Sequence, residues 1–399
     1  MLHILRTLLT MWRLVPGLHK NAAAKTRLRR CMLGLFSIVG TEMLMPRLSD
    51  CPVKAKRMPE EFAIPEFHGH FKFRKHDFYR VLAAIGLTQQ HTRDPIWLRV
   101  GSGDTKSVVR SDWALAVLIK RLATGCRYRD VQAVMGGSKT ALCVTFLHML
   151  ELLFNKYRDR LGDLKFFRHS LPDFVRLLNS LQQKYHSIDC PYDNVIGLVD
   201  GHFVATNRPG GDGCVVPNMY DTDVFNGKTR LHGLKYQGLT TPLGICILHG
   251  PYGGPESDSG MLELSQIEND LAALTAEWQQ QNPASSPLCV YGDSAYRESM
   301  HVVKALPWAL ATAAERELND IMKPVRVLVE QNFACIGQIA GICHVRLSLG
   351  SGPVGMVFPV AVLLTNMYAI LYGNTVTCSI EGALDLLSTA ITIEDYLAV

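Results

Sequence analysis

Three acidic residues lie where their surroundings predict a sheet edge or the border of a buried helix. Asp200 follows the apolar run Ile196–Val199, and Asp293 follows the apolar run Pro287–Tyr291 after one intervening glycine. Short apolar runs of this kind predict buried strands. Glu330 borders the apolar stripe of a predicted helix, in VRVLVEQNFACIG. If the two strands are neighbours and the helix packs beside them, the three carboxylates meet at one point.

Carboxylates gathered in this way repel one another and raise one another's pKa, and divalent cations remove that cost. Oxygen-only ligands select hard ions such as Mg²⁺ or Mn²⁺. Two such ions, roughly 3.5–4 Å apart, can activate a water or a 3′-hydroxyl and stabilise the leaving oxygen of a phosphodiester. The ordinary alternative is three unrelated acids, since aspartate also forms turns by capping its own backbone.

Residues 191–399 have the pattern of a mixed α/β sheet domain, in which strands come first and then alternate with helices. Each of the two aspartates is expected to end its strand. Pro324 is expected near the first turn of its helix or at a kink. The predicted strands are Asn194–Val199, Leu234–Thr240, Ile245–Leu248 and Leu288–Tyr291, the middle two as a hairpin, and the predicted helices are Asp258–Ala276 and Asn319–Ala340.

Residues 58–190 are predicted to be mainly helical. Apolar residues at helical spacing predict helices at Phe78–Leu87 and Ser111–Ala123, the second capped by Ser111 or Asp112. A helix at Tyr128–Met135, a Gly-Gly turn and a helix capped by Ser138, with Lys139 exposed, form a helix-turn-helix pattern. Residues 105–160 contain 10 Lys and Arg against 4 Asp and Glu, which favours DNA binding. An ordinary αα-hairpin is the alternative.

The charge of the 399-residue chain is uneven. The net charge is +5, but residues 1–57 hold 11 Lys and Arg against 2 acids, so the remainder is mildly acidic. We expect residues 1–57 to be a disordered basic arm that meets a polyanion or serves in targeting. Residues 1–30 also resemble a mitochondrial presequence, and a DNA-binding arm or an upstream extension without function are the other interpretations.

Cysteine use and hydropathy argue against three further features: a disulfide framework, a zinc knuckle and a transmembrane helix. The 11 cysteines include no CxxC pair, which argues against a disulfide framework and a zinc knuckle. Cys335, Cys343 and His344 lack an apparent fourth ligand, so we interpret the two cysteines as buried apolar side chains. Val354–Tyr372 is apolar and near membrane length, but Pro359 and Asn366 interrupt it, so we expect a buried helix.

Several segments together resemble the PIF/Harbinger transposase family. They are IGLVDG with its following RP, the stretch Val224–Leu262, YGDSAY, Leu318–Phe333, the helix-turn-helix region, FPVAVLLTNMYAILYGN and the terminal IEDYL. The likeness covers roughly Phe73 to Leu397. It implies an RNase H-like fold with a DDE triad, and Asp200, Asp293 and Glu330 fall on that triad. The expected fold is therefore an α/β, RNase H-like catalytic domain behind a mainly helical region.

The resemblance also identifies Asp258, in PESDSG, with the acid of a family motif, as a fourth metal ligand or a carboxylate close to the metals. A helix N-cap is the alternative. The chain departs from the family pattern at His202, Gln331 and Ser257. None of these departures removes a carboxylate.

A second group of residues consists of candidates for contacts with DNA phosphates near the metals. Each has a structural or solvated role as its alternative, and Arg326 is four residues before Glu330 and could simply pair with it. The candidates are His202, Arg208, His232, Lys235 and Arg326.

The sequence thus predicts a Mg²⁺- or Mn²⁺-dependent DNA endonuclease or transposase that cuts phosphodiesters and, as a transposase, joins 3′-hydroxyl ends to target DNA. The alternative is a domesticated relative that cuts without transposing or only binds DNA. A hydrolase of another phosphate ester is a third reading. The resemblance implies work in the nucleus and a separate Myb/SANT-like partner protein. Membrane binding is not expected, and a dimer is plausible.

Overall fold

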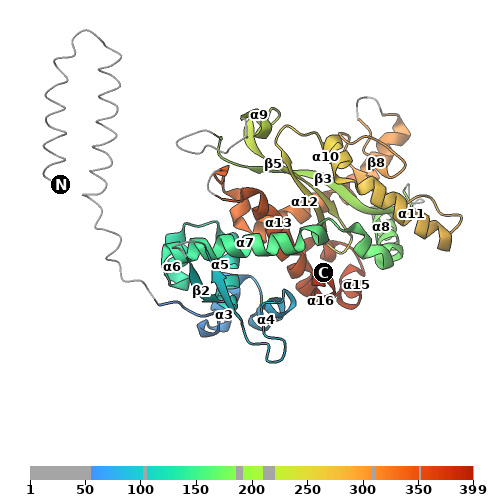
Figure 1. Ribbon diagram of the computed structural model, residues 1–399. Helices are drawn as coiled ribbons and strands as arrows, with labels where there is room; N and C mark the ends of the chain where they lie inside the picture. Colours follow the sequence, from blue (N-terminus) through green and yellow to red (C-terminus); the bar gives the residue numbers. More distant parts are fainter. Residues whose placement is uncertain are drawn as a thin grey trace, which may run out of the picture. The chain divides into compact units, whose positions relative to one another are not determined.

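The description rests on a computed structural model, and it covers residues 55–101, 106–185, 192–209, 221–307, 309, 311–349 and 352–398 (Figure 1). The predictions for residues 1–57 fall almost entirely outside this range. They therefore stay predictions.

A mixed sheet carries the acidic residues. Its central strand β3 pairs antiparallel with β5 on one side and parallel with β7 on the other, and β7 pairs parallel with β8. β4 and β6 both pair antiparallel with β5. The predicted mixed α/β sheet is confirmed, and this strand order is consistent with an RNase H-like domain. The strands are β3 (Val195–Ala205), β4 (Phe225–Asn226), β5 (Leu231–Thr240), β6 (Cys246–Gly253), β7 (Cys289–Gly292) and β8 (Val302–Lys304).

Two strand predictions can be compared directly. The β5–β6 hairpin was predicted correctly. The prediction that Asp200 ends its strand is wrong, because β3 continues for five more residues to Ala205. Residues 201–205 stay extended because they keep their pairing with residues 233–237 of β5. Asp293, in contrast, directly follows the last residue of β7.

Two helices of this part differ from their predicted ranges. Predicted helix Asp258–Ala276 is two helices, because Gln266 has a left-handed backbone between them. Predicted helix Asn319–Ala340 begins six residues earlier, behind Thr312, so Pro324 lies inside it. The helices are α9 (Asp221–Val224), α10 (Asp258–Ser265), α11 (Ile267–Gln281), α12 (Ala313–Ile339), α13 (Val354–Tyr372), α14 (Thr375–Ser379), α15 (Ala383–Ala390), α16 (Ile393–Leu397) and the 3₁₀ turn η6 (Gly341–His344).

The N-terminal part is mainly helical, as predicted, and adds an antiparallel β1–β2 hairpin that the sequence analysis missed. The caps predicted for α5 are wrong: Arg110 is the N-cap, and Asp112 pairs with it. The elements are η3 (Pro59–Glu61), α3 (Ile64–Phe71), α4 (Lys75–Ala84), β1 (Trp97–Val100), β2 (Ser107–Arg110), α5 (Ser111–Thr124), α6 (Tyr128–Met135), α7 (Lys139–Leu161), η5 (Leu164–Ser170) and α8 (Leu171–Tyr185).

Helices α6 and α7 meet at an angle of 98°. The Ser138 hydroxyl accepts a hydrogen bond from the amide of Ala141 and caps α7, and Lys139 is exposed, as predicted. Most of the inward face of α7 is buried against the rest of the chain. The role of this pair as a DNA-binding helix-turn-helix stays a prediction.

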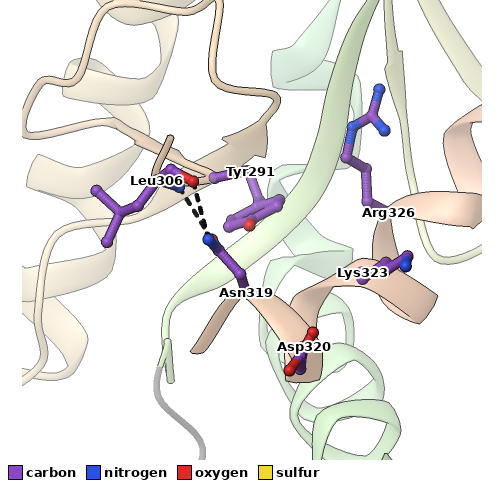
Figure 2. A pocket seen from close by; sticks show the side chains of 7 residues that line it. Tyr291, Leu306, Asn319, Asp320, Lys323 and Arg326 are labelled. Atoms are coloured by element: carbon purple, nitrogen blue, oxygen red, sulfur yellow. Dashed lines mark hydrogen bonds between the residues drawn. The ribbon is translucent and has the colours of Figure 1, made fainter. Parts of the chain in front are cut away.

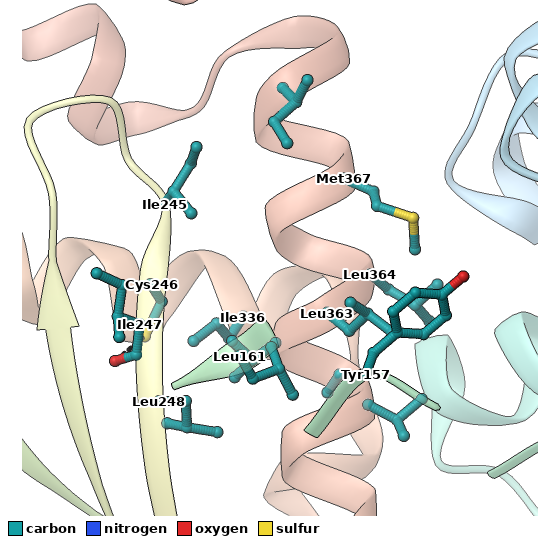
Figure 3. Packing of buried hydrophobic residues seen from close by; sticks show 14 of the residues in the cluster. Tyr157, Leu161, Ile245, Cys246, Ile247, Leu248, Ile336, Leu363, Leu364 and Met367 are labelled. Carbon is teal, nitrogen blue, oxygen red and sulfur yellow. Dashed lines mark hydrogen bonds between the residues drawn. The ribbon is translucent and has the colours of Figure 1, made fainter. Parts of the chain in front are cut away.

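Helix α13 is buried in the core, as predicted, and it joins the two parts of the chain. Its apolar side chains lie between α7, α12 and β6, where Tyr157, Leu161, Ile336 and Leu363 pack together (Figure 3). Residues 55–399 therefore form one compact unit. The division at residue 191 stays a prediction. The seven cysteines within the described ranges are free.

The polar residue of α13, Asn366, completes the edge of the sheet. Its Oδ1 accepts from the amide of Cys246 at 2.9 Å, and its Nδ2 donates to the Cys246 carbonyl at 2.8 Å. The side chain is fully buried. It therefore takes the place of a neighbouring strand at the start of β6.

Asn366→Ala is expected to destabilise the protein by about 2 kcal/mol, because it leaves a buried amide and a buried carbonyl without partners. Urea unfolding measures this, with Asn269→Ala on an exposed face of α11 as the matched control. Equal stability of the two variants would contradict the role of Asn366.

Candidate active site

Parallel pairing of β3 and β7 brings two of the predicted acids together. Leu198 is paired with Tyr291, so Asp200 and Asp293 each lie two residues beyond this pair. Residues in register on neighbouring strands point to the same face of a sheet. Asp293 itself lies just beyond β7, and its negative charge acts on Asp200.

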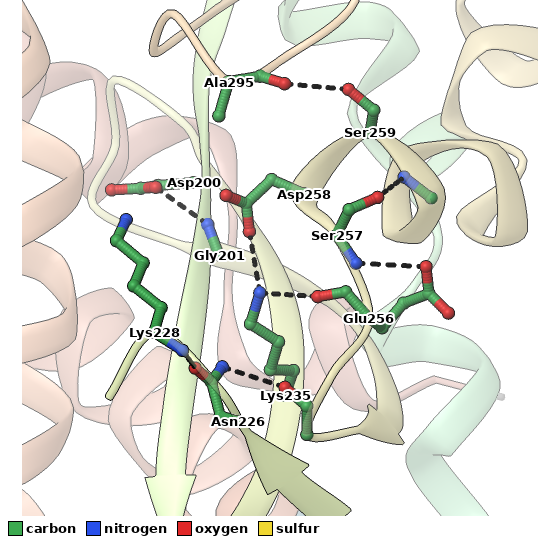
Figure 4. A network of polar contacts seen from close by, with 12 residues as sticks. Asp200, Gly201, Asn226, Lys228, Lys235, Glu256, Ser257, Asp258, Ser259 and Ala295 are labelled. Atoms are coloured by element: carbon green, nitrogen blue, oxygen red, sulfur yellow. Dashed lines mark hydrogen bonds and ion pairs between the residues drawn. The ribbon is translucent and has the colours of Figure 1, made fainter. Parts of the chain in front are cut away.

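The loop that carries Asp293 is fixed by hydrogen bonds. Asp293 Oδ1 accepts from the amide of Ala295 at 2.8 Å. The Ser259 hydroxyl of α10 donates to the Ala295 carbonyl at 2.9 Å, so the loop is tied to the helix (Figure 4). The position of the Asp293 carboxylate is therefore set by backbone contacts.

The third acid, Glu330, is connected to Asp200 through one arginine of α12. Arg326 Nη1 lies 3.0 Å from Glu330 Oε1, and Arg326 Nη2 lies 3.2 Å from Asp200 Oδ2. The predicted i, i+4 pair of Arg326 and Glu330 is present. The link to Asp200, from 126 positions away in the sequence, was not predicted.

Asp200 and Glu330 share Arg326, but the three carboxylates are not gathered into a metal-binding cluster. Among the described residues, no group of three or more His, Cys, Asp or Glu side chains is arranged to hold a metal ion. The guanidinium of Arg326 lies between Asp200 and Glu330 and supplies the positive charge there. Direct convergence of the acids, as expected from the sequence, is therefore not seen.

Asp200 is the acid whose protonation is most affected by its surroundings. Burial raises the pKa of its carboxyl to about 6, and the negative charges of Asp293 and Asp258 act in the same direction. Arg326 and the amide of Gly201, which donates to Asp200 Oδ1 at 2.8 Å, oppose this shift. A further positive charge at this place would be stabilised by the same acids.

Chemically, the donor set fits a hard divalent ion in part. Asp200 and Asp293 offer carboxylate oxygens, and the raised pKa of Asp200, caused first by burial and then by the neighbouring acids, would be lowered by a bound cation. Glu330 is half-exposed and would join them once Arg326 releases it.

Asp258 approaches from the other side of β3. Its Oδ1 lies 3.2 Å from Lys235 Nζ, and it packs so closely against Gly201 that a Cβ there would be 2.5 Å from this oxygen. Figure 4 shows Asp200 and Asp258 on opposite sides of the strand. The N-cap alternative for Asp258 is wrong, because Ser257 caps α10.

Gly201→Ala is expected to destabilise the protein by about 2 kcal/mol, since the new methyl group overlaps Asp258 and also approaches Met261 Cε to 2.9 Å. Urea unfolding tests this against Gly227→Ala, where a Cβ meets nothing within 4 Å. If both variants unfold alike, Asp258 is not held against Gly201.

Tyr296 is a site residue that the sequence analysis quoted in VYGDSAY but did not single out. The side chain is 1% exposed, and its hydroxyl is buried without a hydrogen-bond partner within the described part of the chain. Burial and the charges of Asp200, Asp258 and Asp293 raise its pKa, so the phenol lies close to all three acids. Its position three residues after Asp293 was the feature of the sequence that could have identified it.

The candidates for phosphate contacts have protein partners. His202 is stacked between Phe333 and Phe358, with ring centroids 4.6 and 4.8 Å away, and burial lowers its pKa to about 4. Arg208 and His232 both pair with Asp221, at 3.0 and 2.7 Å. Lys235 and Arg326 pair with the acids described above.

Residues 199–366 match the model of a family described as DDE superfamily endonuclease. The matched segment begins one residue before Asp200 and contains Asp293 and Glu330. Comparisons with curated proteins and with solved structures gave no significant match. The family match supports a DDE transposase-like nuclease, for which DNA is the implied substrate. Nucleases of this family generally use divalent metals.

Proposed function

We propose that the protein is a divalent-metal-dependent DNA endonuclease of the PIF/Harbinger transposase type, with Asp200, Asp293 and Glu330 as its catalytic residues. The observation that supports the proposal is the parallel pairing of β3 and β7, in which Asp200 and Asp293 each lie two residues beyond the Leu198–Tyr291 pair. The family match over this segment points in the same direction.

Asp200 and Asp293 would hold Mg²⁺ or Mn²⁺ on the α12 face of the sheet, and Glu330 would complete the set after leaving Arg326. A bound divalent cation supplies Lewis-acid stabilisation of phosphoryl oxygens and lowers the pKa of water. Arg326, once released, remains beside the site and can pair with a DNA phosphate, which arginine binds through two donors.

For Asp258 two roles are proposed. It is either a fourth metal ligand or a carboxylate that lies close to the ligands. Its pairing with Lys235 favours the second role. Through Gly201 it fixes the backbone next to Asp200, so its charge acts on Asp200 across the strand.

The helical part is proposed to grip DNA through α6 and α7, with Lys139 exposed at the start of α7. The basic residues 1–57 would add phosphate contacts or serve nuclear import. Action in the nucleus, end joining to target DNA and a Myb/SANT-like partner complete the proposal. They are supported by the resemblance of the sequence alone.

The proposal is tested by incubating the full chain with labelled duplex and branched DNA in Mg²⁺ or in EDTA. We expect cleavage only with the metal, and binding in EDTA that weakens steeply as salt rises, because phosphate contacts release counterions. DNA binding without cleavage under any metal would favour the alternative, a domesticated DNA-binding protein. Binding that does not depend on salt would contradict both.

A further inference from the structure

A pocket of about 380 Å³ lies beside the candidate active site, between the end of β7, the loop after β8 and one face of α12 (Figure 2). This volume is within the range of small-ligand pockets, about 300–1,000 Å³. Its lining is Tyr291, Ala305, Leu306, Asn319, Asp320, Lys323 and Arg326.

The walls of the pocket are fixed by the protein itself. Asn319 Oδ1 accepts from the amide of Leu306 at 2.9 Å, and its Nδ2 donates to the Leu306 carbonyl at 2.8 Å (Figure 2). The amide of Ala305 donates to the Gly292 carbonyl at 3.1 Å. The pocket is therefore held open between α12 and the strand that leads to Asp293.

The lining combines two kinds of surface. Ala305 and Leu306 offer apolar area, and Tyr291, which is 2% exposed, contributes only the edge of its ring. Lys323 and Arg326, three residues apart and thus on one face of α12, offer positive charge. Arg326 is the same side chain that contacts Asp200 at 3.2 Å. The pocket and the acids are thus joined through one guanidinium.

We propose that this pocket takes one unpaired nucleotide of the DNA strand next to the cleaved phosphate, and the proposal rests on the function proposed above. The base lies against Ala305 and Leu306, and its phosphate meets Lys323 and Arg326. Asp320, an acceptor at the rim, suits bases with an exocyclic amino group. In duplex DNA a base is enclosed by its neighbours, so only an unpaired or extruded base reaches the pocket.

The test measures binding, in EDTA, of a short single strand that carries 2-aminopurine, by anisotropy and by emission of the base analogue. Lys323→Ala removes the phosphate contact, and Ala305→Phe fills the pocket. Each is expected to weaken binding about tenfold, because each removes one of the two kinds of contact that the pocket offers. Lys184→Ala removes the same charge from α8, outside the pocket, and is expected to bind like the wild type. Thermal unfolding verifies that each variant is folded.

The outcomes separate the two proposals. If the wild type cuts DNA but folded Ala305→Phe binds the strand as tightly as it does, the nucleotide pocket is wrong and the nuclease stands. If the wild type does not bind DNA, both are wrong. If the 2-aminopurine mononucleotide binds as tightly as the strand, the pocket serves free nucleotides and the proposal is overturned.

Discussion

Asp293→Asn is expected to abolish metal-dependent DNA cleavage while leaving the fold and DNA binding intact. The amide keeps an oxygen that can accept from Ala295, so the loop after β7 keeps its hydrogen bond. What the variant loses is the negative charge opposite Asp200. Metal binding contributes several kcal/mol to the transition state of phosphoryl transfer, so we expect a fall in rate of about a thousandfold or more.

Single-turnover cleavage in Mg²⁺ measures this effect, and anisotropy in EDTA measures DNA binding by the same protein. Asp385→Asn, an exposed residue of α15, is the control for loss of one carboxylate. Asp258→Asn separates its two proposed roles, because a metal ligand would match the loss at Asp293 and a neighbour would not. Cleavage by Asp293→Asn at the wild-type rate would end the nuclease proposal.

The sheet and its two aspartates could be predicted because the signals are local. IGLV and LCVY are apolar runs that end at glycine and aspartate, and this pattern identifies buried strands wherever they pair. That the two strands are neighbours was only a condition in the sequence analysis, and it is now seen in the register of Leu198 with Tyr291.

Contacts between distant segments could not be predicted in the same way. Pairing of Arg326 with Glu330, one turn away on the same helix, was the alternative to a DNA contact. Its second partner, Asp200, depends on how α12 packs on β3. Similarly, Ser257 and Asp258 are both good N-cap residues. In the structure Ser257 caps α10, and Asp258 pairs with Lys235 of β5, a contact between distant segments.

One missed feature was present in the sequence. Thr312 and Glu315 form a capping box in front of α12, with the Thr312 hydroxyl accepting from the Glu315 amide and the Glu315 carboxylate accepting from Thr312. This T-x-x-E pattern predicts a helix start. The presence of Pro324 favoured a later start in the sequence analysis.

Asp200→Asn is expected to stabilise the metal-free protein at pH 7 by up to about 3 kcal/mol, because two pKa units correspond to about that free energy. The pKa of Asp200 is raised in the folded protein to about 6. The folded state therefore binds the proton more tightly than the unfolded state does. The stability that this carboxyl contributes is complete below about pH 4, the pKa of an unfolded aspartate, and is lost as the pH rises through 6.

Urea unfolding in EDTA between pH 4 and pH 7 tests this, with Asp385→Asn as the control. The difference between Asp200→Asn and the wild type should be small at pH 4 and grow with pH. A constant difference would show that the variant acts through packing or through loss of the Arg326 pair. Adding Mg²⁺ at pH 7 should stabilise the wild type and not the variant, because a ligand stabilises only the state that binds it. If the Asp200 carboxylate destabilises the metal-free protein and Mg²⁺ reverses this effect, a metal-binding role explains the residue better than a structural role.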